Sequence, residues 1–281
     1  FRSGGTSPDL WDGEARVTDP QDSANLINTH WQKAFDHKDM SAPEARHMKC
    51  WLDDFTKARG RLPLVPDSHW YPNEGDFNRA IKHFGNSAPG PDGVPYVAYR
   101  GVLRLSCLVL LSFALLLLSL ATTADDLVPD FNEAWLFLLV KKATVEDDIL
   151  GPAVAPVDLR PLSIVNCFNR IIANVFRYKL ASLANDFIDP VQRGFLPGRS
   201  ILENILDLDV SALRAWNDSL LHGMHDKSAL VLFDFAAAFP SMGHDFIWAA
   251  LAAIGIPPFV IAAYRWLYHE NKHKLVWKGR T

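Results

Sequence analysis

The chain has 281 residues, of which 49% are hydrophobic and 21% charged, a composition that excludes a disordered chain and a fibrous repeat. Its formal net charge of -4 excludes a uniformly basic nucleic-acid coat, although a local basic groove remains compatible with it. The 3 cysteines are far apart, so neither a zinc knuckle nor a disulfide framework is predicted. The sequence begins at Phe1 without a methionine, and we expect a fragment of a longer protein.

Residues 1–75 are predicted to form a helical linker region. Apolar side chains recur with helical spacing after Asp22 and again around Trp51, and prolines then interrupt the chain. An aromatic residue followed by two aspartates, at residues 51–54, lies inside the second pattern. We therefore expect this short motif on a helix and not in a metal-binding hairpin.

Residues 105–124 carry no charge and are long enough to span a bilayer. Serines and threonines interrupt the run, and Ser112, Ser119 and Thr123 fall on nearly one helical face, which is typical of a buried helix with a polar edge. A membrane-anchored protein that uses residues 105–124 stays open as an alternative.

The rest of the chain alternates helical and strand patterns without regular βαβ spacing, which predicts the α+β class. A capping-box pattern opens the helix at Ser200. The expected elements are a strand over 135–140, helices over 168–183 and 200–223, a strand over 229–235, and helices after 244 and 258.

Asp234 ends the apolar run over residues 229–235. Burying a carboxylate in such a strand is costly unless a partner or a metal compensates it, which makes Asp234 a candidate metal ligand. The alternative is an aspartate that caps the turn after the strand.

Several segments resemble, in order and spacing, successive blocks of reverse transcriptases, above all those of non-LTR, LINE-type retrotransposons. Residues 17–35 look like the linker between the endonuclease and the polymerase of that family, and residues 87–93 look like the start of its fingers. The other matching segments are residues 158–163, 189–200, 233–234 and 238–239.

The resemblance implies a partial right-hand polymerase, with the fingers region over residues 76–228 and the start of the palm over 229–281. It implies an RNA-directed DNA polymerase, a nucleotidyltransferase that uses Mg²⁺ or Mn²⁺ in a two-metal reaction. The expected partners are an RNA template, a DNA primer and a deoxynucleoside triphosphate (dNTP), and the expected location is the nucleus.

The resemblance also implies roles for individual residues. Asp234 would be the catalytic, metal-binding aspartate, with the backbone carbonyl of Phe235 beside it. Phe239 would be the steric gate that excludes a ribose hydroxyl. The remaining implied dNTP ligands are Lys141 or Lys142 and Arg160, which clamp the triphosphate, and the backbone N–H groups of Ala237 and Ala238. The implied template and primer contacts are Gln192, Arg193, Gly194, Phe195 and Arg199.

Each of these residues also has an ordinary structural interpretation. Arg160 suits a loop, Lys141 and Lys142 suit a solvated strand end, Gly194 suits a simple turn, and Phe239 suits a core.

The aromatic-x-Asp-Asp hairpin that carries the family's second carboxylate pair does not occur after Asp234 in this sequence. We therefore expect a truncated chain that is catalytically incomplete and binds no metal tightly. Its further partner would be the missing C-terminal palm and thumb of the same polyprotein.

His269, Glu270 and His273 form an HExxH pattern, which on a helix binds zinc in a hydrolase. No third ligand follows, and lysines flank the motif. A basic helix end is the alternative to a zinc hydrolase.

Overall fold

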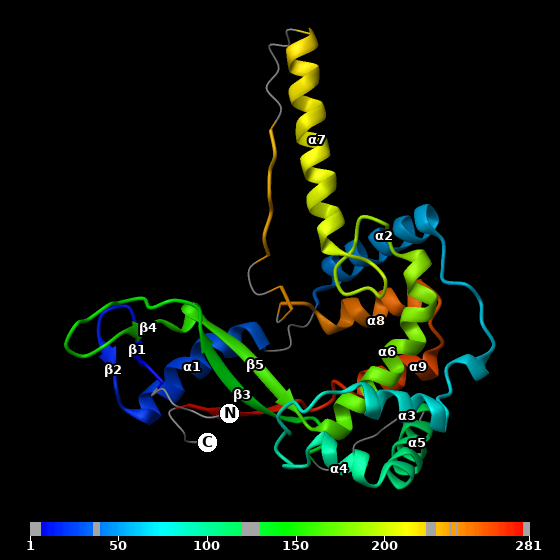
Figure 1. Ribbon diagram of the computed structural model, residues 1–281, viewed down its shortest axis with the longest axis horizontal. Coiled ribbons are helices and arrows are strands. Elements are labelled where there is room, and N and C mark those ends of the chain that lie inside the picture. The colour runs from blue at the N-terminus through cyan, green and yellow to red at the C-terminus, as the bar shows by residue number, and fades with distance from the viewer. Residues whose placement is uncertain are drawn as a thin grey trace.

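The computed structural model describes residues 7–35, 40–119, 130–222, 229–235, 238–239 and 241–277. Helices and strands are both present, which confirms the α+β class. Figure 1 shows a helical body, a twisted sheet region beside it, and one long helix, α7, that projects away from the body.

The helical body has a continuous apolar core. It is built from α3 (Glu74–His83), α4 (Tyr96–Gly101), α5 (Leu103–Ser119), α6 (Cys167–Phe187), α8 (His244–Ala253) and α9 (Pro258–Trp266). The outer helix α2 (Ala42–Arg59) starts at a capping box formed by Ser41 and Glu44. Leu62 and Trp70 share this core with Phe77, so packing is continuous across residue 76, and the predicted domain division there stays a prediction.

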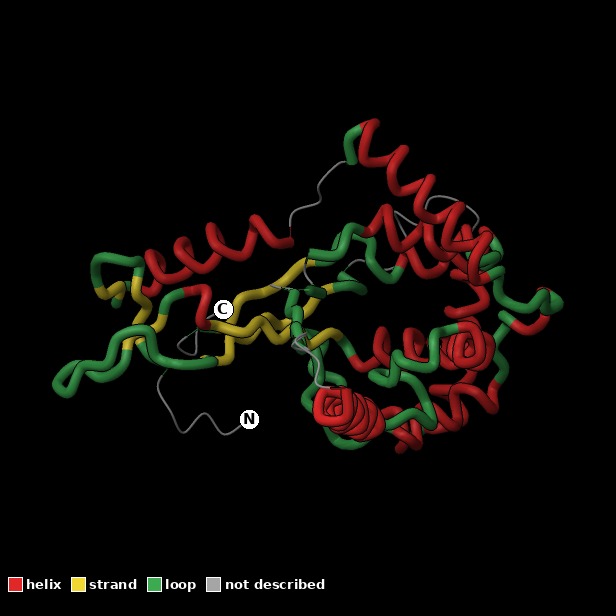
Figure 2. Tube along the Cα trace, turned by 90° about the horizontal axis from the view of Figure 1, so that it is seen from above, coloured by secondary structure: helices red, strands yellow, loops and turns green. Residues whose placement is uncertain are grey.

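The sheet that positions the site is centred on β3 (Glu133–Val140). It pairs antiparallel with β5 (Leu159–Val165) and parallel with β6 (Lys272–Val276). A second small sheet joins β1 (Asp9–Trp11), β2 (Arg16–Val17) and β4 (Ala153–Val154). Figure 2, seen from above, shows α1 (Pro20–Phe35) running along the sheet region. Ile27 and Trp31 of α1 are buried with Leu136, Leu138 and Leu159 of the sheet.

Helix α5 covers most of the uncharged run at 105–124, and it packs in the body through Leu110, Ala114 and Leu117. Ser112 and Ser119 lie on its exposed side, but that side also carries exposed leucines and a valine, so the predicted polar edge is wrong: Leu105, Leu108, Val109, Leu115 and Leu116. Within the part of the chain that the structure describes, no helix is long and apolar enough to cross a bilayer. Residues 120–124 lie outside that part.

Helix α7 (Ile201–His222) starts where the sequence predicts. The Leu202 N–H donates to Ser200 Oγ over 3.3 Å, but the Glu203 carboxylate binds Arg193 and not the backbone of Ser200. The predicted capping box is therefore only half formed.

The predicted strand over residues 229–235 is wrong, because the segment is irregular in the structure. Leu232, Phe233 and Phe235 are 77%, 86% and 80% exposed, so the run is not buried either. A strand needs a neighbouring strand for its backbone hydrogen bonds, and none of the strands that the structure describes pairs with this segment.

Candidate nucleotide and nucleic-acid site

The β3–β5 hairpin brings the predicted triphosphate cations to one end of the sheet. Leu139 lies opposite Arg160 in the register, and the Lys141 N–H donates to the Asp158 carbonyl over 2.8 Å. The Lys142 ammonium lies 3.7 Å from a carboxylate oxygen of Asp158. Residues that are distant in sequence are therefore neighbours at the end of this hairpin where residues 141–158 connect the two strands.

The side chains at this end flank it from different directions. The Lys141 ammonium turns to the short 3₁₀ helix η2 (Pro156–Asp158) and donates to the Val157 carbonyl over 3.2 Å. Leu159 faces the core, and strand alternation places the exposed Arg160 on the other face of the sheet. Arg160 belongs to β5, so its interpretation as a loop arginine is wrong. The exposed lysines agree with the interpretation of a solvated strand end.

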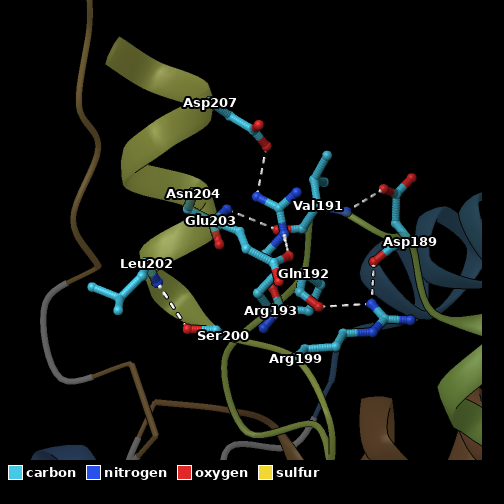
Figure 3. A network of polar contacts seen from close by, with 10 residues as sticks. All are labelled: Asp189, Val191, Gln192, Arg193, Arg199, Ser200, Leu202, Glu203, Asn204 and Asp207. Carbon is cyan, nitrogen blue, oxygen red and sulfur yellow. Dashed lines mark hydrogen bonds and ion pairs between the residues drawn. The ribbon is translucent and has the colours of Figure 1, made fainter. Parts of the chain in front are cut away.

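The loop at residues 189–200 is held together by two arginines that the sequence assigned to nucleic acid (Figure 3). The Arg199 guanidinium donates to the carbonyls of Ile188, Asp189 and Gln192 over 2.9, 2.6 and 2.7 Å, and to the carbonyl of Asn185. Because these carbonyls lie in the last turn of α6 or shortly after it, Arg199 also compensates the negative end of that helix. Arg199 thus has a structural function that the sequence did not reveal.

Arg193 is bound to α7. Its Nε lies 2.9 Å from Glu203 and its Nη1 lies 2.6 Å from Asp207, and its side chain is only 15% exposed. Figure 3 shows this guanidinium pointing to the helix. Arg193 therefore anchors the base of α7, and its predicted contact with template stays untested.

The aromatic rings of two separately predicted segments meet beside this loop. The rings of Phe195 and Phe239 are 6.1 Å apart and nearly perpendicular. They are 90% and 82% exposed, so the alternative of a core aromatic at Phe239 is wrong. The structure thus brings together the predicted template contact and the predicted steric gate.

Glycine in this loop is required at a different position from the one predicted. Gly194 lies in a turn without a left-handed backbone, and a Cβ there would meet nothing closer than the Gln192 Nε2 at 3.6 Å. Gly198 has a φ of +75°, which glycine adopts without strain. The sequence signal for this turn glycine is the dipeptide Pro197-Gly198, because Pro-Gly pairs mark turns.

The predicted metal ligands stand in the exposed segment that precedes α8. Asp234 is exposed, so the argument that burial makes it a metal ligand was wrong. Its carboxylate is accessible to solvent. Ala238 is also exposed, and Ala237 lies outside the described residues. In Figure 1 this segment runs beside α7, apart from the labelled strands β3 and β5. No group of three or more His, Cys, Asp or Glu side chains in the described parts of the chain could hold a metal ion.

The loop at residues 87–93 is fastened to the start of α6. Arg170 donates to Ser87 Oγ over 3.1 Å and to the Ala88 carbonyl over 2.5 Å, and it lies 5.0 Å from the centre of the Tyr96 ring. Burial raises the pKa of Tyr96 to about 12, so its hydroxyl stays protonated at neutral pH. An open pocket adjoins this loop and is lined by Asn86, Ser87, Ala88, Pro89, Pro95, Tyr96 and Val97.

The HExxH pattern is not on a helix. His269 follows α9 in a turn, Glu270 has a φ of 44°, and His273 lies in β6. The ring of His273 stacks on Phe35 at 5.8 Å, and burial lowers the pKa of this histidine. The prediction of a zinc-binding helix is therefore wrong, and so is the alternative prediction of a basic helix end. The aspartate pair at residues 53–54 lies within α2, as expected.

No protein-family model matches this chain, and the curated proteins contain no significant match to it. The resemblance to reverse transcriptases therefore rests on the sequence motifs alone.

Proposed function

We propose that this chain is the fingers region and the start of the palm of a LINE-type reverse transcriptase, an RNA-directed DNA polymerase in its complete form. The observation that carries the proposal is the register of the β3–β5 hairpin. It gathers Lys141, Lys142 and Arg160, which the resemblance assigns to one ligand, at one end of the sheet. The contact between Phe195 and Phe239 supports the proposal independently, because it joins two other matching blocks.

The cations at the hairpin end suit a triphosphate. Phosphoryl transfer depends mainly on positioning and on neutralising charge, and lysine and arginine supply both. The Asp234 carboxylate and the Phe235 carbonyl are hard oxygen donors of the kind that Mg²⁺ prefers. One carboxylate cannot hold two metal ions, so we propose binding of nucleotide and of template and primer as the activity of this polypeptide.

Replacing Arg160 by glutamine is expected to weaken the binding of an RNA template annealed to a DNA primer, in the presence of a dNTP. The loss of a charge-assisted phosphate contact corresponds to about five- to thirtyfold in affinity. Fluorescence anisotropy of the labelled duplex measures this affinity across a salt series, and the salt dependence is expected to decrease by about one counterion.

The matched control for this measurement is Arg46→Gln, because Arg46 is an exposed arginine on α2, outside the sheet. It is expected to bind the duplex like the wild-type chain. Equal affinities of wild type and Arg160→Gln at every salt concentration would contradict the proposal.

The catalytic part of the proposal needs a polypeptide that continues in the same reading frame beyond Thr281. Such a protein is expected to extend a DNA primer on an RNA template with Mg²⁺, and Asp234→Ala is expected to abolish the extension, because the metal loses its carboxylate. Incorporation of labelled dNTP measures this. Activity that persists in the variant would contradict the role of Asp234.

A further inference from the structure

Helix α1 brings two more basic side chains to the loop end of the β3–β5 hairpin, where residues 141–158 connect the two strands. The helix is fixed against the sheet by the buried side chains of Ile27 and Trp31, and it contacts η2. His30 lies between these two residues in the helix, and its ring is half-buried and 5.1 Å from the Trp31 ring. Lys33, one turn further on, is exposed. This part of the chain belongs to the segment predicted as a linker, and the sequence assigned no function to it.

The cations around η2 are crowded and only partly compensated. Burial is the largest cause that lowers the pKa of His30, and the positive charges of Lys33 and Lys141 lower it further. The carboxylate on η2, Asp158, already binds Lys142 and accepts a hydrogen bond from Thr144 over 2.8 Å. Lys141 donates to a neutral carbonyl of η2. Such a cluster gains free energy when an anion binds.

We propose that α1 and the hairpin end together form a binding site for the triphosphate chain of a nucleotide, in which His30 and Lys33 join Lys141 as phosphate ligands. The inference rests on the proposed function, because it extends the triphosphate site of that function from Lys141 to the sheet face that α1 covers, opposite the face that carries Arg160. It makes the upstream helix part of the nucleotide site. It also makes binding dependent on pH through His30.

The sign of the pH dependence follows from the charges. In the free protein His30 is neutral at pH 7, because its pKa lies below the usual value of 6.5. A bound oligophosphate raises that pKa, so binding is accompanied by proton uptake and becomes tighter as the pH falls toward 6. The charged groups that act on His30 are Lys33 and Lys141, both of them lysines. His273 also packs against α1, through Phe35, and it is a second histidine to test.

The experiment is calorimetric titration of the whole chain with inorganic tripolyphosphate at about pH 6 and pH 7.5, in buffers of different ionisation enthalpy. The wild-type chain is expected to take up protons on binding, in addition to any protonation change of the tripolyphosphate itself. His30→Gln is expected to lose this extra uptake and to bind about fivefold more weakly at the lower pH. Lys33→Gln is expected to weaken binding by a similar factor at both pH values, and it leaves the buried side of α1 intact.

The matched controls are His47→Gln and Lys49→Gln on α2, both exposed and away from the sheet, and they are expected to behave like the wild type. His273→Gln is expected to retain the extra proton uptake. If His273→Gln abolishes that uptake and His30→Gln does not, the inference is wrong.

The result separates this inference from the proposed function. If Arg160→Gln reduces the binding of tripolyphosphate while His30→Gln and Lys33→Gln do not, the inference fails and the proposed function stands. If a short single-stranded oligonucleotide binds in a manner dependent on Lys33 and tripolyphosphate does not bind, the inference also fails. If Arg160→Gln changes neither tripolyphosphate nor primer–template binding, the proposed function itself fails.

Discussion

Replacing Gly90 by alanine is expected to destabilise the fold by about 1–3 kcal/mol, because the added methyl group has no room. A Cβ at this position would lie 2.3 Å from the Asn166 Oδ1, 2.4 Å from the Asn166 nitrogen and 2.6 Å from its Cα. Two of these atoms are backbone at the start of α6, so they cannot rotate away. The loop at residues 87–93 would have to separate from α6.

Urea unfolding followed by far-UV circular dichroism measures this loss. Gly85→Ala is the matched control, since a Cβ on Gly85 meets nothing within 4 Å, and it is expected to leave stability unchanged or slightly raised. Equal unfolding midpoints for Gly90→Ala and Gly85→Ala would show that the contact with Asn166 is unimportant. The same separation would break the two hydrogen bonds that Arg170 donates to Ser87 and Ala88, so the loop would also lose this attachment to α6.

Helices with a strong apolar period were predictable from the sequence. The pattern over 168–183 forms α6, and the pattern from Ser200 forms α7. Both were predictable because helical hydrogen bonds are local and the apolar periodicity can be read within the segment. The strand before Lys141 was equally clear, since β3 is a short apolar run that the core buries on one face.

Strands that depend on distant partners were not predictable. The apolar run at 229–235 looks like a buried strand, yet the structure describes no neighbour that pairs with it. The opposite error occurred at β6, where Lys272 and Lys274 suggested a helix end. Parallel pairing with β3, which places Lys274 beside Trp135, makes this basic segment a strand. Local composition carries no information about either partner.

Some residues of the candidate site were predictable from the sequence and others were not. The resemblance grouped Lys141, Lys142 and Arg160 before their geometry was known, and the hairpin register makes them neighbours. The contribution of His30 was not predictable, because it depends on how α1 packs against η2. The partners of Arg193 and Arg199 were equally hidden, since a basic residue in a loop motif does not reveal whether it binds a phosphate or the protein's own carbonyls.

Replacing Arg199 by alanine is expected to lower the free energy of unfolding by about 2–4 kcal/mol, since it removes several charge-assisted hydrogen bonds and leaves carbonyls without a donor. The guanidinium joins the end of α6 to the turn that leads into α7, through the carbonyls of Ile188, Asp189 and Gln192. Thermal and urea unfolding measure the loss. The control is Arg214→Ala on the exposed surface of α7, which is expected to change stability by less than about 0.5 kcal/mol.

Arg199→Lys distinguishes the structural role from direct binding to nucleic acid. Lysine keeps the positive charge, but its ammonium cannot donate in the forked geometry that spans these carbonyls. If Arg199 acts by holding the loop, the lysine variant recovers less than half of the lost stability. Its affinity for the primer–template duplex then falls while the salt dependence stays that of the wild type, because the number of charges is unchanged. If Arg199→Lys instead keeps the wild-type stability and affinity, and Arg199→Ala loses affinity together with about one counterion of salt dependence, Arg199 is a phosphate contact, because a point charge suffices for that role.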